Sequence, residues 1–215
     1  SHFPNVHLDV SPCGLYVVYA LYTNLEDPPV RGFGCSRLDG TGCITVQTRA
    51  VPFYFSWSPD SRYVAWLGSH QDNITFEVRV SVAFCLLLIL LPIRAQVVDL
   101  HAATPVSQVL VDNGAPVFFD WHPSGRRIVM VFGDRLLFDI TVSGSAPPVV
   151  DLVSRSTGRF NGAPRWMTSA RDNNHALMCS LDGQDLCVTV VDMDARAALK
   201  RIVVSSDSMN RFVPL

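Results

Sequence analysis

The chain has 215 residues, of which 48% are apolar and 17% charged, and its formal net charge is −2. This length is enough to bury a substantial core, and the apolar fraction excludes a disordered acidic or basic chain. The small net charge gives no electrostatic basis for binding nucleic acid or anionic lipid.

A motif made of a strand, a proline turn and a second strand recurs along the chain. Its three clear copies begin at Val6, Phe53 and Val117 and read VHLDVSPCGLYVVYAL, FYFSWSPDSRYVAWLG and VFFDWHPSGRRIVMVF. A fourth copy, APRWMTSARDNNHALMCS from Ala163, keeps its tryptophan and its second strand but lacks the proline. Internal repeats of this kind indicate a repeat architecture.

The residues of the motif suit a tight turn between two strands. Pro12, Pro59 and Pro123 fix φ at the second turn position. Asp60 and Ser124 can bond to the local backbone, and Gly14 and Gly125 can adopt positive φ. His122 takes the place of a serine, so we expect a structural role for it. We expect three tryptophans that end the preceding strand to pack between neighbouring sheets: Trp57, Trp121 and Trp166.

The spacing of the motif defines a repeating unit. Pro12 and Pro59 are 47 residues apart, as are Pro123 and the aligned Ala170, whereas Pro59 and Pro123 are 64 residues apart. A unit of 47 residues accommodates four strands, and Asp-Gly or Gly-Asp pairs at residues 39–40, 133–134 and 182–183 mark hairpin turns. Four-stranded units at this period are typical of a β-propeller.

The segments FSWSPDSRYVAWLG, FDWHPSGRRIVMVF and LDVSPCGLYVVYAL resemble the WSPDG-type repeats of TolB-like β-propellers. CSLDGQDLCVTVVDMD, residues 179–194, resembles the strand–Asp-Gly–strand segment of such a blade. Within this family TolB is a periplasmic scaffold, and similar repeats form the non-catalytic propeller of prolyl oligopeptidase-like enzymes. The fourth turn departs from the family pattern, and no Trp-Asp pair closes a blade as in standard WD repeats.

The predicted fold is all-β, a propeller of about four four-stranded antiparallel blades that form one partial domain over residues 1–215. The blades are expected over residues 6–48, 51–112, 115–152 and 163–205. Residues 210–215, NRFVPL, match the first strand of a further blade. We therefore interpret the chain as a fragment with an incomplete ring.

Residues 80–96, VSVAFCLLLILLPIRAQ, are foreign to the repeat. Their removal restores the 47-residue spacing and joins the flanks into an alternating strand, NITFEVRVVDL. The apolar run of about a dozen residues is too short to span a bilayer, and its internal position excludes a secretory signal. An apolar loop would expose an aggregation-prone patch. We favour a translated intron, because Val-Ser and Gln fit splice-site codons and the residues between them have pyrimidine-rich codons.

The sequence shows no motif for chemistry. It lacks a G-x-S-x-G nucleophile elbow and a phosphate-binding loop, and no two histidines have metal-ligand spacing. The aspartates at residues 182–194 are too sparse for a calcium loop. We therefore predict no catalytic, cofactor-binding or metal-binding residues, and no cofactor. Two cysteine pairs, Cys35/Cys43 and Cys179/Cys187, are interpreted as reduced residues packed in strands, with cross-strand disulfides as the alternative.

The leading functional hypothesis is a non-catalytic, TolB-like scaffold that binds other proteins or a ligand through a propeller face or the central channel. The alternative is the N-terminal gating propeller of a prolyl oligopeptidase-type serine hydrolase. A downstream G-x-S-x-G would favour the alternative. A propeller enzyme that uses channel-lining residues is a third hypothesis. We expect no nucleic-acid partner and no membrane span, and the sequence does not indicate a cellular location.

Overall fold

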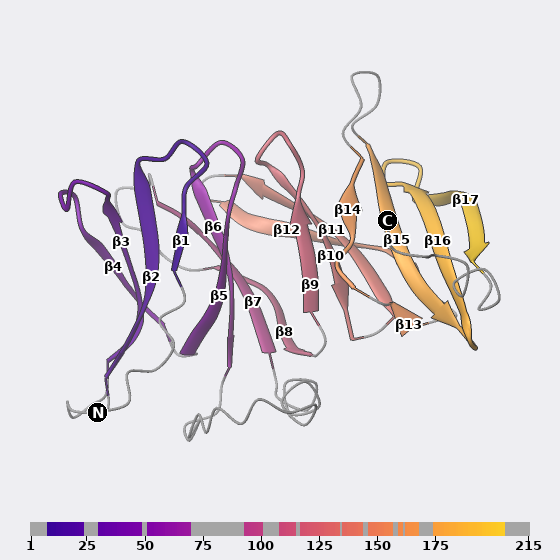
Figure 1. Cartoon of the computed structure of the whole chain (residues 1–215), viewed down its shortest axis with the longest axis horizontal. Helices are drawn as coiled ribbons and strands as arrows, with labels where there is room; N and C mark the ends of the chain where they lie inside the picture. The colour runs from indigo at the N-terminus through magenta and orange to yellow at the C-terminus, as the bar shows by residue number, and fades with distance from the viewer. Residues whose placement is uncertain are drawn as a thin grey trace, which may run out of the picture. The chain divides into compact units, whose positions relative to one another are not determined.

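The computed structural model describes residues 8–23, 30–48, 51–69, 93–100, 108–114, 117–133, 135–143, 146–156, 159–160, 162–167 and 174–204. Within these ranges the chain contains no helix, and its strands form four sheets (Figure 1). The all-β prediction is therefore confirmed. No helix of the described part is long and apolar enough to cross a membrane.

Each of the first three sheets is an up-and-down meander, because neighbouring strands in the sheet follow one another in the chain. The first sheet contains β1 (Leu8–Val10), β2 (Tyr16–Thr23), β3 (Val30–Arg37) and β4 (Ile44–Gln47). The second contains β5 (Val51–Trp57), β6 (Tyr63–Ser69), β7 (Ile93–Asp99) and β8 (Gln108–Gly114). The third contains β9 (Val117–Trp121), β10 (Arg127–Phe132), β11 (Leu136–Ser143) and β12 (Ala146–Arg155). The fourth contains β13 (Arg159–Phe160), β14 (Arg165–Trp166), β15 (His175–Asp182), β16 (Asp185–Asp192) and β17 (Ala197–Val204).

The fourth sheet begins earlier than the sequence motif suggested, at Arg159 instead of Ala163. Its first strand is split in two, since Phe160 pairs with Ser180 and Trp166 pairs with Ala176 on the same strand β15. Gly162, between the two pieces, has a φ of +108°, which interrupts the extended backbone. The sequence motif, which begins at Ala163, includes only the second piece, β14.

The chain divides into two compact units. The first contains the whole of the first two sheets, and the second contains the fourth sheet and all of the third except residues 143 and 146–148. The first unit comprises residues 1–115 and 143–148, and the second comprises residues 116–142 and 149–215. In each unit the two sheets share one apolar core. The core of the first unit consists of Val18, Phe33, Cys35, Val46, Phe55, Trp57, Val64, Trp66, Val98 and Leu100. That of the second consists of Val129, Val131, Leu137, Val153, Phe160, Trp166, Ala176, Met178, Val191 and Met193.

The apolar segment 80–96 is described only at its end, since residues 80–92 lie outside the described ranges. Ile93 to Gln96 form the first half of β7, where Ile93 pairs with Ser69 and Gln96 with Trp66 of β6. Without residues 80–96, FEVR at 76–79 would precede Val97 and take the same positions in the chain. Both sequences alternate in polarity, so either can complete the strand. The predicted further strand at 210–215 also lies outside the described residues.

Candidate binding surface at the turn end of the blades

The proline turns between the first two strands of three sheets have the same backbone hydrogen bonds. The N–H of Ser11, Ser58 and His122 each donates to the carbonyl five residues later, at 2.8–2.9 Å. The third residue after each of these donates its N–H back to the carbonyl of Ser11, Ser58 or His122. These returning residues are Gly14, Ser61 and Gly125, with φ of +70°, +59° and +70°. The prediction for the two glycines is confirmed, and Ser61 is a non-glycine residue in the same left-handed conformation.

The side chain that precedes each proline also holds the turn closed. The hydroxyls of Ser11 and Ser58 accept the N–H of Tyr16 at 3.0 Å and of Tyr63 at 2.9 Å. Nδ1 of His122, only 8% exposed, accepts the N–H of Ser124 at 3.0 Å. The ring of His122 also packs edge-on against Trp166. These contacts give His122 the structural role that was expected for it.

We use the name turn end for the edge of each sheet that carries these turns. The third strand of each sheet returns to the same edge. In the first sheet the N–H of Leu38 donates to the carbonyl of Leu15, and in the second the N–H of Leu100 donates to that of Arg62. Pro12, Pro59 and Pro123 are exposed there. The turn end is therefore an accessible surface held by regular strands.

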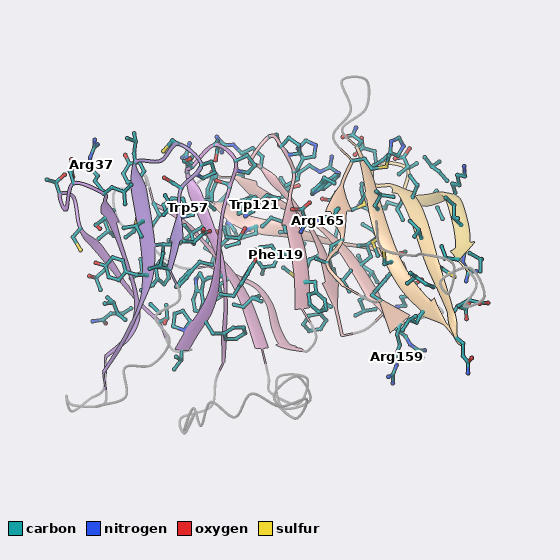
Figure 2. The ribbon with its side chains drawn as sticks, in the orientation of Figure 1. Arg37, Trp57, Phe119, Trp121, Arg159 and Arg165 are labelled. Carbon is teal, nitrogen blue, oxygen red and sulfur yellow. The ribbon has the colours of Figure 1, made fainter. Side chains whose placement is uncertain are left out.

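One tryptophan contact recurs between neighbouring sheets. In the first unit the indole N–H of Trp57, which is labelled in Figure 2, donates to the carbonyl of Asp9 at 3.2 Å. In the second unit the indole N–H of Trp166 donates to the carbonyl of Asp120 at 3.2 Å. Asp9 and Asp120 both stand three residues before a turn proline. Both donors are the last residue of a first strand, and both are 6% exposed. The packing role predicted for these two tryptophans is confirmed, and Trp121 is equally buried.

A charged cluster ties the third and fourth sheets together at the turn end. The guanidinium of Arg127 donates to Asp139 at 2.6 Å and to Asp194 at 3.1 Å, and it lies over the ring of Trp166. Hydrogen bonding to Asp139 raises the pKa of Arg127, although partial burial opposes this effect. The sequence motif gave no sign of this cluster, because the aligned positions of Arg127 in the first two sheets are Tyr16 and Tyr63.

A cavity of about 150 Å³ lies between the two sheets of the first unit. Its lining consists of Tyr16, Cys35, Gly42, Ile44, Trp57, Ser61 and Leu100. The hydroxyl of Ser61 already accepts the N–H of Cys13 at 3.1 Å. Burial raises the pKa of the Cys35 thiol to about 11, so this thiol is not a nucleophile at neutral pH. The cavity is lined mainly by apolar side chains.

The five cysteines in the described part of the chain are all free thiols. Strand register explains why neither cysteine pair forms the cross-strand disulfide that was the alternative to reduced thiols. Cys35 pairs with Ile44, so Cys43 lies one residue out of register, and Cys179 pairs with Val188, so Cys187 is likewise displaced. Successive residues of a strand point to opposite faces, so the two thiols of each pair face apart. Across the described ranges no three His, Cys, Asp or Glu residues gather in a group that could hold a metal ion.

No family model and no curated protein matches the chain. Solved structures do match. The Swd1 (Cps50) β-propeller domain of Myceliophteria thermophila is 10% identical, with a TM-score of 0.56 over 93% of this chain and 55% of that domain. Oligogalacturonate lyase from Vibrio parahaemolyticus is 11% identical, with a TM-score of 0.55 over 92% of this chain and 53% of the lyase. TolB from Acinetobacter baumannii is 11% identical, with a TM-score of 0.49 over 94% of this chain and 43% of TolB.

At such identities, the likeness to the first two structures shows the fold alone. The chain spans about half the length of the structures that it matches. Its sheets have the strand order of propeller blades, and one tryptophan contact joins the blades of each unit. The four sheets are blades of a β-propeller, as the resemblance of the repeats predicted.

Proposed function

We propose that this chain is a non-catalytic propeller scaffold that binds another protein at its turn end. The main observation behind this proposal is that the polar side chains of the repeat form hydrogen bonds to other groups of the protein. Ser58 bonds to Asp60, His122 to Ser124, and Arg127 to two aspartates, all within or between blades. Groups engaged in this way build a rigid frame and leave the exposed turns for recognition.

The turn end of the first sheet has the composition of a small protein-binding patch. Leu15 and Leu38 are 49% and 58% exposed, and a backbone hydrogen bond of 2.9 Å holds them side by side. Arg37 and Asp39, which form a salt bridge at 3.4 Å, flank Leu38. Apolar residues at the centre of a patch and polar residues around its rim are typical of a protein interface. A protein partner with an apolar anchor side chain suits this patch best.

Paired substitutions on the native protein test this proposal. The double variant Leu15→Ser/Leu38→Ser should lose the partner that co-purifies with the native protein, because it removes the apolar centre of the patch. The control is Leu199→Ser, at a residue that is 56% exposed on β17. This variant should retain the partner. Equal retention by both variants, with unchanged circular dichroism, would contradict binding at the turn end.

The non-catalytic part of the proposal needs its own test. A fluorophosphonate probe labels an activated serine such as the nucleophile of a serine hydrolase. We expect the native protein to remain unlabelled under conditions in which a known serine hydrolase is fully modified. Labelling of a serine on the same polypeptide would favour the gating propeller of a hydrolase instead.

A further inference from the structure

We define the forward face of a sheet as the face with which the first sheet meets the second and the third sheet meets the fourth. In the first sheet this face carries Val18, Phe33, Cys35 and Val46, which form a core with the second sheet. In the third sheet it carries Val129, Val131, Leu137 and Val153, which form a core with the fourth. Val18 and Val129 each stand six residues after the turn proline, so the two forward faces are equivalent.

The fourth sheet uses its other face to meet the third. Ala176, Met178 and Val191 point into the shared core. Because side chains alternate along a strand, Leu177, Cys179 and Leu181 of β15 point to the forward face. Register places Val190, Val188 and Leu186 opposite these three, and places Ile202 and Val204 of β17 beyond them.

This forward face of the fourth sheet is apolar and is not buried. It consists of Leu177, Cys179, Leu181, Leu186, Val188, Val190, Ile202 and Val204, and every member is half-buried or exposed. Leu181 and Ile202 are 38% and 45% exposed. Lys200 at the edge and the His175–Asp192 pair at the turn end border the face. The equivalent residues of the first sheet are at most 4% exposed.

We propose that the forward face of the fourth sheet is the docking surface for a further four-stranded blade of the same repeat in the same polypeptide. An open apolar sheet face of eight side chains is unfavourable in water and marks an interaction site. The first and third sheets bury the same face against the next blade. This chain also covers only 55% and 53% of the two matched propellers.

The pattern of the chain favours a covalent continuation over a second copy as the occupant. Three residues separate β4 from β5, and three separate β12 from β13, so a new blade follows the outer strand closely. Five residues separate β17 from the sequence NRFVPL at 210–215, which resembles AVPFYF at the start of the second sheet. By analogy with Asp9 and Asp120, the carbonyl of Arg165 would accept the indole N–H of the new blade's tryptophan, because Arg165 also precedes the last residue of a first strand.

Thiol alkylation tests this inference without any substitution, because three cysteines report on three environments. Cys179 lies on the forward face, Cys187 is buried on the packed face, and Cys13 is exposed at the turn end. Native protein and the 215-residue chain, kept monomeric by dilution, are treated with iodoacetamide and quantified by peptide mass spectrometry. We expect Cys179 to react at least about tenfold more slowly in the native protein, with Cys13 fast and Cys187 slow in both. Equal rates for Cys179 would overturn the inference whatever becomes of the proposed function, since no binding partner enters the assay.

Discussion

At the scale of single residues, the repeat shows which turn positions a sequence reveals. Gly14 and Gly125 were predicted to take positive φ, because glycine has no Cβ to oppose it. A positive φ at Ser61 was not predicted, since a serine in the sequence does not indicate a left-handed backbone. The structure supplies a reason for its presence, because its hydroxyl accepts the N–H of Cys13 from the neighbouring blade.

Two substitutions at Ser61 should separate the hydrogen bond from the backbone strain. Ser61→Ala loses the bond and keeps the strain, so we expect a loss of about 1 kcal/mol in the free energy of unfolding. Ser61→Gly also loses the bond but relieves the left-handed strain, which costs a non-glycine residue roughly 1 kcal/mol. Its stability should stay within about 0.5 kcal/mol of the parent. Urea unfolding measures both, and an alanine variant as stable as the glycine variant would contradict this explanation.

Asp192 should make stability depend on pH. Its carboxylate accepts the N–H of Ala195 at 2.8 Å and of Asp194 at 3.0 Å, and the bond from Ala195 is the main cause of its lowered pKa. Since the folded pKa lies below the unfolded value near 4, the ionised group stabilises the fold above that value. This contribution is lost as the pH falls through the folded pKa.

The variant Asp192→Asn isolates this contribution, because the amide keeps an oxygen acceptor but has no charge. We expect the variant to be less stable than the parent at pH 7 and the difference in stability to be smaller at about pH 3. Urea midpoints at both pH values give the comparison. A difference in stability between variant and parent that is the same at both pH values would contradict this role of Asp192.

At the scale of elements, the tryptophan contact makes the two blade pairs comparable. Trp57→Phe and Trp166→Phe each remove one indole hydrogen bond and leave a small cavity, so each should cost about 1–3 kcal/mol of stability. We expect similar losses, because both indoles bond to the carbonyl of an equivalent aspartate. Leu199→Ala on the exposed strand β17 is the control and should cost little. A large loss at one tryptophan and none at the other would show that the contacts are not equivalent.

The strands were largely predictable from the sequence, whereas the contacts between sheets were not. The hairpin between β15 and β16 was predicted to within one residue, since its turn lies at residues 183–184 and Asp182 of the Asp-Gly pair still pairs with Asp185. The split of the first strand into β13 and β14 escaped prediction, since Phe160 lies outside the motif. The cluster around Arg127 was not predicted either. Asp194 is 67 residues away from Arg127 in the chain, and only the fold brings the two together.

At the scale of the whole molecule, the 47-residue period organises the chain and the segment 80–96 departs from it. We propose that this segment derives from a retained intron. Sequencing of the mature transcript across the junction checks this, and we expect a predominant product that joins Arg79 to Val97. Transcripts that keep the 17 codons under every condition would contradict it.

Whether one 47-residue unit repeats through the chain is tested most directly by deleting residues 80–96 and recording thermal unfolding by circular dichroism. The deletion brings residues 76–79 to the positions of Ile93–Gln96 in β7, so the second sheet should remain complete. A deletion of the same length over residues 97–113 is the control, because it removes the rest of β7 and most of β8. The repeat predicts that the first deletion keeps the β-sheet spectrum and unfolds cooperatively while the control does not. Loss of the sheet signal and of cooperative unfolding in both deletions would contradict it.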